Sequence, residues 1–440
     1  MKGKIILALL ALTISFMYGG GILHNCNQST QYIGLLNRNA STDIDASYYN
    51  PAGITQLPVG WHMSFSNQFI IQNRDIESDY AFLNDDTYEG TVNVMFYPNI
   101  YIAHSMGKMA YSFGLLPVGG GGTAEFDDGL PSFEYNWAAF TGLPAAALDP
   151  QLAAMGNITG YEIDAEFTAS NVMVGLQFGF AYQATEQLSI GLVARYVDAT
   201  TTYEGSLKNI GLTTEAGVTI DDQMVPLFGD INVDSELTGT AFTPIISLNY
   251  TTGNGNMFAL RYEAATEIER EYDTKVDGTG LFPDGEKRHD DLPTMLNIGM
   301  QYGLSEGTTL YTDFNYWDHE ADWNGREDNV DAGYEIGTGL EYTMSDAMVA
   351  RYGFLWSTKG PKEEAQSDMT HDLDSWTVSG GFGYNLNEKM TFNGGVLYTK
   401  YIEQDKTNTL TTATTGQTIS PVETYNRQNI TIGFSLDYAL

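Results

Sequence analysis

Apolar and polar residues alternate with a period of two along most of the chain after Trp61. The clearest segment sets Ile430, Ile432, Phe434, Leu436 and Tyr438 against Asn429, Thr431, Gly433, Ser435 and Asp437. Successive side chains of a strand point to opposite faces, so this pattern predicts strands with one apolar face and one polar face. Residues 172–182 and 376–384 repeat it. Alternation alone fits a membrane barrel or a soluble sandwich with one wet face.

The connections between the predicted strands alternate between short and long. The short turns are His104–Lys108, Gln183–Glu186, Thr251–Asn256, Gly303–Gly307, Thr343–Asp346 and Asn385–Glu388. The long connections are Asn73–Gly90, Gly119–Thr168, Tyr203–Gly239, Asp273–Asp291, His319–Ala332, Thr358–Asp374 and Gln404–Arg427. Six turns and seven long connections give fourteen strands. Short periplasmic turns and long external loops are typical of outer-membrane barrels, so both chain ends are expected in the periplasm.

Six tyrosines occupy equivalent positions on predicted strands that lead into a short turn or the chain end. Each falls on the apolar face just before a turn or the chain end: Tyr182, Tyr250, Tyr302, Tyr342, Tyr384 and Tyr438. Amphipathic rings collect where lipid head groups meet hydrocarbon. The pattern therefore favours an all-β, 14-stranded antiparallel outer-membrane β-barrel over a sandwich.

The N-terminal region differs from the rest. Residues 1–20 carry Lys2 and Lys4, an apolar run and small residues near Gly19, which predicts a secretory signal peptide. Residues 21–60 are rich in Asn, Gln, Ser and Thr and show no sustained alternation. We expect short helices and turns folded inside the barrel, as a hatch, with the barrel itself spanning residues 61–440.

Composition and charge narrow the partners. The formal net charge of -36 argues against nucleic acid, because nucleic acid binding requires basic patches. A mean hydropathy of -0.21 excludes a helical membrane bundle but permits a barrel, whose strands are apolar on one face. The single cysteine, Cys26, allows no internal disulfide bond.

No catalytic or metal-binding motif stands out. The six histidines are scattered, without His-Glu-x-x-His or zinc-ligand spacing, and there is no Gly-x-Ser-x-Gly. His371 and Asp372 are adjacent, but they fall in a predicted loop, where we expect a solvated pair. We therefore expect no enzyme activity, no cofactor and no metal.

Three arginines are predicted to point into the lumen: Arg195, Arg261 and Arg351. One interpretation pairs them with nearby carboxylates such as Glu263 or Glu341, or with the hatch. The other is that one of them binds a ligand carboxylate, to which a guanidinium offers two parallel hydrogen bonds. Sequence does not rank the three.

Two further segments bear on a hydrophobic ligand. The long connection Gly119–Thr168 carries Phe126, Phe133, Trp137 and Phe140, which either capture ligand or pack the loop down as a lid. Some helix is expected between Pro144 and Met155. In the third strand, Pro117 and Gly119 either kink the wall or end the strand, because proline removes a ladder hydrogen bond.

The run Asp45–Gly53, with Asn50, Pro51, Ala52 and Gly53 just ahead of the first strand, predicts a turn in which Gly53 permits positive φ. It resembles the hatch of the FadL-type family of outer-membrane long-chain fatty acid transporters, which includes aromatic-hydrocarbon channels. Weaker similarities continue at residues 113–117, 188–191, 291–293 and 375–398.

The resemblance implies passive uptake of hydrophobic molecules, such as long-chain fatty acids. Its steps would be loop capture, hatch rearrangement, and lateral exit through a kink in the third strand. The expected partners are such molecules, outer-membrane lipid and lipopolysaccharide, and the family suggests a monomer. The alternative is a general porin or a surface adhesin barrel without a specific hydrophobic ligand. An outer-membrane enzyme ranks third.

Overall fold

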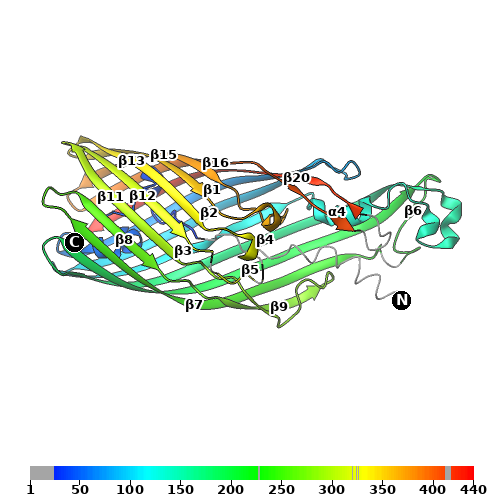
Figure 1. Ribbon diagram of the computed structural model, residues 1–440, viewed down its shortest axis with the longest axis horizontal. Helices are drawn as coiled ribbons and strands as arrows, with labels where there is room; N and C mark the ends of the chain where they lie inside the picture. The colour runs from blue at the N-terminus through cyan, green and yellow to red at the C-terminus, as the bar shows by residue number, and fades with distance from the viewer. Residues whose placement is uncertain (1–23, 226–227, 320, 324, 326, 412–417) are drawn as a thin grey trace.

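A computed structural model describes residues 24–225, 228–319, 321–323, 325, 327–411 and 418–440. Within them, fourteen strands form one closed antiparallel barrel (Figure 1). Each strand pairs with its neighbours along the chain, and the last strand pairs with the first from His62–Ala439 to Ser78–Glu423. The predicted 14-stranded barrel is thus confirmed. The predicted signal peptide, residues 1–20, lies outside the described residues.

The wall consists of β1 (Gly60–Ser78), β2 (Thr87–Ser105), β3 (Met109–Phe126), β4 (Ile158–Gln183), β5 (Leu188–Thr214), β7 (Ile231–Thr251), β8 (Met257–Glu263), β11 (Met295–Ser305), β12 (Thr308–Trp317), β13 (Gly333–Ser345), β14 (Met348–Thr358), β15 (Ser375–Asn387), β16 (Met390–Tyr401) and β20 (Val422–Ala439). The six predicted short turns all join consecutive strands at one end. Shorter strands at the other end are β6 (Thr219–Ile220), β9 (Glu269–Asp277), β10 (Lys287–His289), β17 (Gln404–Thr407), β18 (Leu410–Thr411) and β19 (Thr418–Ile419).

The strands run further than the sequence indicated. β4 has 26 residues and β5 has 27, so at about 3.3 Å per residue each is far longer than a bilayer core of about 30 Å requires. Much of the predicted long connections, including residues 203–214 and 231–239, is therefore strand, and reading these residues as loops was wrong. The reason is that strand extensions beyond the membrane have no lipid-facing side, so their apolar alternation fades.

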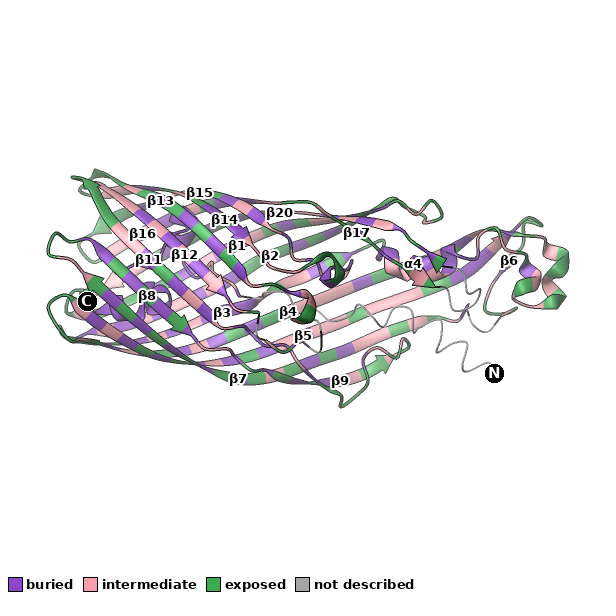
Figure 2. Cartoon of the chain, in the orientation of Figure 1, coloured by how far each residue is buried: buried purple, intermediate pink, exposed green. Residues whose placement is uncertain are grey.

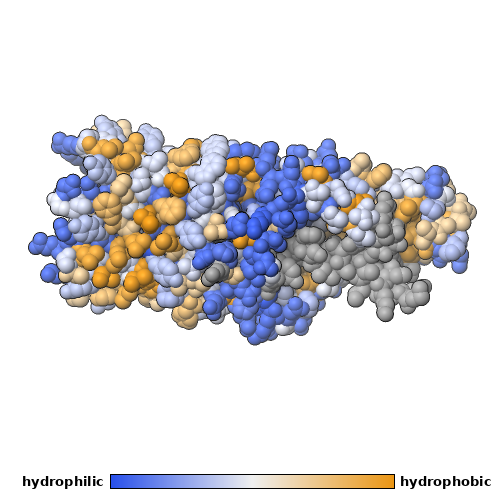
Figure 3. Space-filling model, viewed as in Figure 1, coloured by the Kyte–Doolittle hydropathy of each residue, from blue (hydrophilic) through white to orange (hydrophobic). Residues whose placement is uncertain are grey.

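The outer surface of the barrel follows the predicted parity (Figure 2). Phe178 and Phe434 are exposed. Tyr182, Tyr250 and Tyr342, which were predicted to lie at the lipid head-group level, are exposed near the short turns. In Figure 3 apolar side chains gather over the end of the barrel that carries those turns. No helix among the described residues is long and apolar enough to cross a membrane.

The segment from His24 to Leu57 lies inside the barrel, and β1 begins at Gly60. It contains α2 (Thr30–Leu35), α3 (Ala46–Tyr49) and the 3-10 helix η1 (Pro51–Gln56). The remaining helices lie in the long connections: α4 (Pro131–Ala138), η2 (Ala145–Ala147), η3 (Pro150–Met155), η5 (Glu327–Asn329) and η6 (Glu363–Ala365). The helical turns within Pro144–Met155 were expected, whereas α4 was not.

Glycines on the inner wall let this segment approach the strands closely. A Cβ at Gly381 would lie 2.7 Å from the Cα of Gly34, and a Cβ at Gly353 would overlap the carbonyl oxygen of Leu35. Side chains at these wall positions would therefore displace α2. Backbone packs on backbone here, so the interior segment fits the lumen tightly.

Candidate functional site

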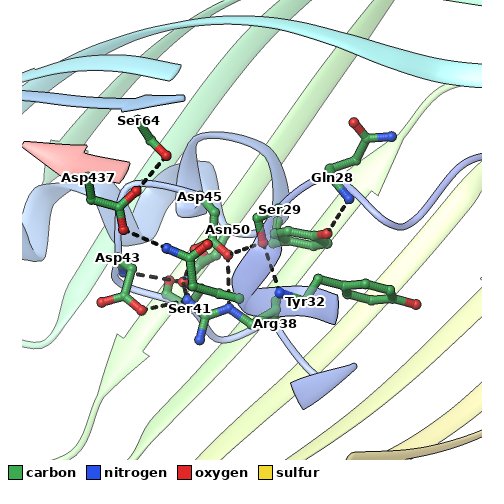
Figure 4. Close-up of polar contacts among 12 residues, drawn as sticks. Gln28, Ser29, Tyr32, Arg38, Ser41, Asp43, Asp45, Asn50, Ser64 and Asp437 are labelled. Carbon is green, nitrogen blue, oxygen red and sulfur yellow. Dashed lines mark hydrogen bonds and ion pairs between the residues drawn. The ribbon is translucent and has the colours of Figure 1, made fainter. Parts of the chain in front are cut away.

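The interior segment is held together by an ion-pair network around the buried side chain of Arg38 (Figure 4). The Arg38 Nη2 atom lies 2.8 Å from Asp45 Oδ1 and 2.6 Å from Asp43 Oδ2. The hydroxyl groups of Ser29 and Ser41 donate to Asp45 over 2.8 and 2.6 Å. Buried charges are stable when they are paired and hydrogen-bonded, so these contacts fix the chain between α2 and α3.

The predicted hatch residues fasten the segment to the wall. The Asn50 side-chain amide donates to Asn249 Oδ1 over 2.9 Å, and the Ala52 backbone amide donates to Ser247 Oγ over 2.8 Å. Pro51 begins η1, so this stretch is a turn of 3-10 helix. Gly53 does not have the positive φ that was expected. It is required for space instead, because a Cβ there would overlap the Asn50 side chain.

Arg195 and Arg261 point into the lumen as predicted, and both pair with Glu263, which is fully buried. Their guanidinium carbons lie 5.2 and 4.5 Å from the ring centroid of Tyr48, from α3. His24 Nε2 lies 3.7 Å from the same carboxylate. Wall and interior segment thus share one charge cluster.

Arg351 also points inward. Its Nε donates to Glu341 Oε2 over 2.7 Å and its Nη1 to Asn393 Oδ1 over 2.9 Å. All three arginines therefore have the internal partners that the structural interpretation expects. A ligand-binding role for any of them stays a prediction.

On the side of the interior segment that faces away from the short turns, a cavity of about 390 Å³ reaches the wall between β2 and β3. Pairing of these strands stops after Val92–Ala124 and resumes at Ile100–Leu115, so residues 93–99 of β2 do not pair with β3. The cavity lining includes Leu115, Leu116 and Pro117 on β3, and Val94, Phe96 and Pro98 on β2. The barrel wall is thus incomplete at this point.

Pro117 and Gly119 lie at this opening. The β3–β4 register shifts between Pro117 and Gly119 and again before Gly122, yet β3 continues to Phe126, so Pro117 interrupts the strand without ending it. The N-terminal end of the interior segment donates hydrogen bonds to the backbone carbonyl groups of β3 at this irregularity. The Asn25 backbone amide donates to the Val118 oxygen over 2.9 Å, and Gln28 Nε2 donates to the Pro117 oxygen over 2.6 Å.

A second cavity of about 260 Å³ adjoins the first and shares His24, Gln72 and Arg427 with it. Arg74, Arg427 and Lys359 contribute its cationic lining. Sequence reasoning missed all three, because each was assigned to a long connection or its edge. Strand parity would have placed Arg74 and Arg427 inside, had β1 and β20 been continued further.

The predicted capture residues pack into the end of the molecule opposite the short turns. Phe126 is buried and lines the second cavity, and Phe133 packs in the same apolar cluster. Trp137 and Phe140 are buried among Ile210, Leu212 and other apolar residues, away from the cavities. Trp137 and Phe140 thus pack the long connection against other apolar residues, as the lid interpretation expects. A role in ligand capture stays a prediction.

Hydrogen bonds hold α4 to the rim of the barrel. The Tyr135 hydroxyl donates to Glu423 Oε1 over 2.7 Å, and the Ser132 amide donates to Asp368 Oδ2 over 2.9 Å.

The prediction that His371 is solvated was wrong. Its ring is fully buried and stacks on Tyr425 at a centroid distance of 5.0 Å. Burial, and after it the guanidinium groups of Arg74 and Arg427, holds the pKa of His371 well below its ordinary value.

Comparison with solved structures gives similarity over nearly the whole chain. A FadL homologue from Pseudomonas aeruginosa has a TM-score of 0.69 at 10% identity, covering 96% of this chain and 99% of that one. The toluene transporters TodX of P. putida and TbuX of Ralstonia pickettii have TM-scores of 0.57 and 0.55 at 11% and 14% identity, with the same coverage. No family profile and no curated protein matches the sequence. The likeness confirms the FadL-type fold that the sequence predicted.

Proposed function

We propose that this chain, which has the FadL-type barrel fold, is an outer-membrane channel for the passive uptake of hydrophobic molecules. The observation that carries the proposal is the opening between β2 and β3. The cavity behind it is lined by inward residues and also by Phe96, Val172 and Val174, whose side chains are 67%, 39% and 36% exposed. Apolar side chains therefore continue from the lumen to the outer surface of the wall.

This geometry suits a lateral route. At about 390 Å³ the cavity falls in the range of ligand pockets, which is about 300–1,000 Å³. Below it the interior segment fills the lumen, so a straight path to the short-turn end is closed by α2 and α3. A hydrophobic molecule that leaves through the wall enters hydrocarbon and avoids water, which favours exit sideways.

The proposed topology follows from the same features. The end with long strand extensions faces the exterior, and Leu440, at the short-turn end, faces the periplasm. The N-terminal part of this prediction concerns residues outside the described range. We further propose that the channel works as a monomer, contacts outer-membrane lipid and lipopolysaccharide, and needs movement at Asn50–Gly53 and around the N-terminal segment to open.

A disulfide tether across the opening tests the route. A Cβ at Gly122 would lie 2.7 Å from Val94 Cγ2, so cysteines at these two positions are close enough to bond. The pair Val94→Cys and Gly122→Cys is made in a Cys26→Ser background, and uptake of a long-chain fatty acid and of toluene is measured in cells. We expect oxidation to lower uptake about tenfold or more and a reductant to restore it.

The control tether joins Ala103→Cys to Ser112→Cys, which are already register partners in the same strand pair. It should leave uptake unchanged. Uptake that persists through the oxidised Val94–Gly122 tether would overturn lateral exit. Permeation of a sugar into proteoliposomes, without uptake of either hydrophobic probe, would favour the general porin instead.

A further inference from the structure

The wall has a second irregularity in β2, on the other side of the opening from the irregular part of β3. The β1–β2 register shifts between Gln68 and Ile70, and over that step β1 advances two residues while β2 advances three. Met95 and Phe96 are consecutive in β2, yet they are 68% and 67% exposed. Consecutive residues of a regular strand point to opposite faces, so β2 contains a β-bulge here.

The side chain of Asn67, on β1, holds the backbone of this bulge. Its Nδ2 atom donates to the Met95 carbonyl oxygen over 3.2 Å, and its Oδ1 atom accepts from the Tyr97 backbone amide over 2.9 Å. In hydrocarbon every backbone polar group needs a partner within the protein, because no water is available. Asn67 thus supplies one donor and one acceptor to the bulged stretch of β2.

Asn67 lies on the outward face of β1, among apolar residues. The nearest outward positions of the strand are Phe65, Phe69 and Ile71, and the side chains of Phe65 and Ile71 are about half exposed. A polar side chain in such surroundings loses hydration and must regain hydrogen bonds from the protein. The two bonds to β2 offset that loss, so the bulge explains the presence of an asparagine at this position.

Two prolines would meet if β2 and β3 were paired through the opening. On the short-turn side of the opening, Ile100 pairs with Leu115. Continuing this register by two residues sets Pro98 opposite Pro117. Neither proline has a backbone N–H, so neither strand could donate to the other from these positions. The Tyr97 hydroxyl donates to the Pro117 carbonyl oxygen over 2.9 Å, so a side chain joins β2 to β3 here.

We propose that Asn67 and Pro98 are positioning residues that hold β2 away from β3 and thereby set the width of the wall opening. A β-bulge bends its strand, and Asn67 fixes that bend at Met95 and Phe96. Pro98 keeps the following stretch of β2 from pairing with β3. The opening is therefore built from both strands, and Pro117 supplies only the β3 side. This inference rests on the proposed function and makes the opening the part of the channel that selects molecules by width.

Uptake by cells of hydrophobic probes of graded width tests the inference. One series runs from benzene through toluene and naphthalene to pyrene, and the other is dodecanoate with a terminal phenyl, naphthyl or pyrenyl group. The comparison is between the narrowest and the widest members that the parent takes up. Asn67→Leu removes both hydrogen bonds to the bulge and suits an apolar surface. We expect it to lower uptake of the widest member at least about tenfold and that of the narrowest less than about threefold.

Two controls accompany this variant. Asn73 is an exposed asparagine on the same face of β1 that pairs with Thr91 in a regular stretch, so Asn73→Leu should leave uptake of all probes unchanged. Asn67→Asp should behave as the parent. A carboxyl group in hydrocarbon is held in its neutral form, which offers one donor and one acceptor at the same places as the amide.

A second variant acts on the same opening without touching Asn67. Pro98→Val restores a backbone donor on β2 and places a residue there that favours strand structure, so β2 can pair further with β3. We expect the uptake ratio of widest to narrowest member to fall about threefold or more, in the same direction as in Asn67→Leu.

The outcomes separate the two proposals, with folding of each variant judged by heat-modifiable electrophoretic mobility. A general defect lowers uptake of narrow and wide probes by the same factor. An equal loss for both, or no loss for either, in folded Asn67→Leu and Pro98→Val would overturn the positioning role and leave the channel proposal standing. If Asn67→Leu does not fold, Pro98→Val decides alone. Failure of the folded parent to take up any member of either series would overturn the channel proposal itself.

Discussion

Replacing Glu263 by Gln should destabilise the barrel interior strongly. Glu263 is the carboxylate partner of both Arg195 and Arg261, and all three side chains are buried. The substitution keeps the size of the side chain and removes the negative charge, so two buried guanidinium groups lose their counter-ion. Removing one partner of a buried ion pair costs about 3–5 kcal/mol. We expect a loss of that size in the free energy of unfolding.

The assay is urea unfolding of protein in detergent micelles, followed by the change in tryptophan fluorescence. The matched control is Asp234→Asn, which breaks an exposed ion pair to Lys275 and should cost less than about 1 kcal/mol. The double variant Arg195→Met with Glu263→Gln has the same net charge in the cluster as the parent. It should be more stable than Glu263→Gln alone.

A loss below about 1 kcal/mol in Glu263→Gln would refute this reasoning. It would mean that water or another group balances Arg195 and Arg261 in solution. The two arginines would then be available to a ligand carboxylate, as the second interpretation of the sequence holds.

Three further outcomes are expected. Gly353→Val should unseat α2, because a side chain there overlaps Leu35, and should make proteoliposomes permeable to sugar; Gly253→Val, in open space, should not. Tyr135→Phe removes the hydroxyl bond to Glu423 and should speed protease cleavage near α4 by about five- to a hundredfold, as expected for about 1–3 kcal/mol of local stability. His371 is buried and neutral with a lowered pKa, so the unfolded chain binds more protons than the folded chain below pH 6.5. The free energy of unfolding should therefore decrease as the pH is lowered below 6.5, and it should decrease less in His371→Gln.

Period-two alternation predicted the membrane-facing part of the fold well. In β20 each outward residue from Ile430 to Leu436 lies on the exposed face, because lipid and lumen impose opposite polarities on one strand. The same parity placed Arg195, Arg261 and Arg351 correctly. The local sequence did not predict the strand extensions, since their outer faces do not meet lipid and the contrast between the two faces of each strand is weaker there.

The candidate site was predicted less completely for a related reason. Arg74 and Arg427 lie near the ends of β1 and β20 opposite the short turns, where the apolar signal fades, so they were read as loop residues. Helix α4 depends on distant partners such as Glu423 and Asp368, which its own sequence does not indicate. Pro117 marked the irregular strand, but the missing β2–β3 pairing is a relation between two strands that a single segment cannot show.

The glycine-lined contact between α2 and the wall also bears on how the protein is assembled. Helix α2 precedes the barrel in the chain, yet it packs on β14, β15, β16 and β20, which are synthesised last. The helix therefore makes all of its contacts with the wall only when these strands are folded and β20 is paired with β1. Packing of the interior helix and closure of the barrel therefore depend on the same strands, so neither can be complete without the other.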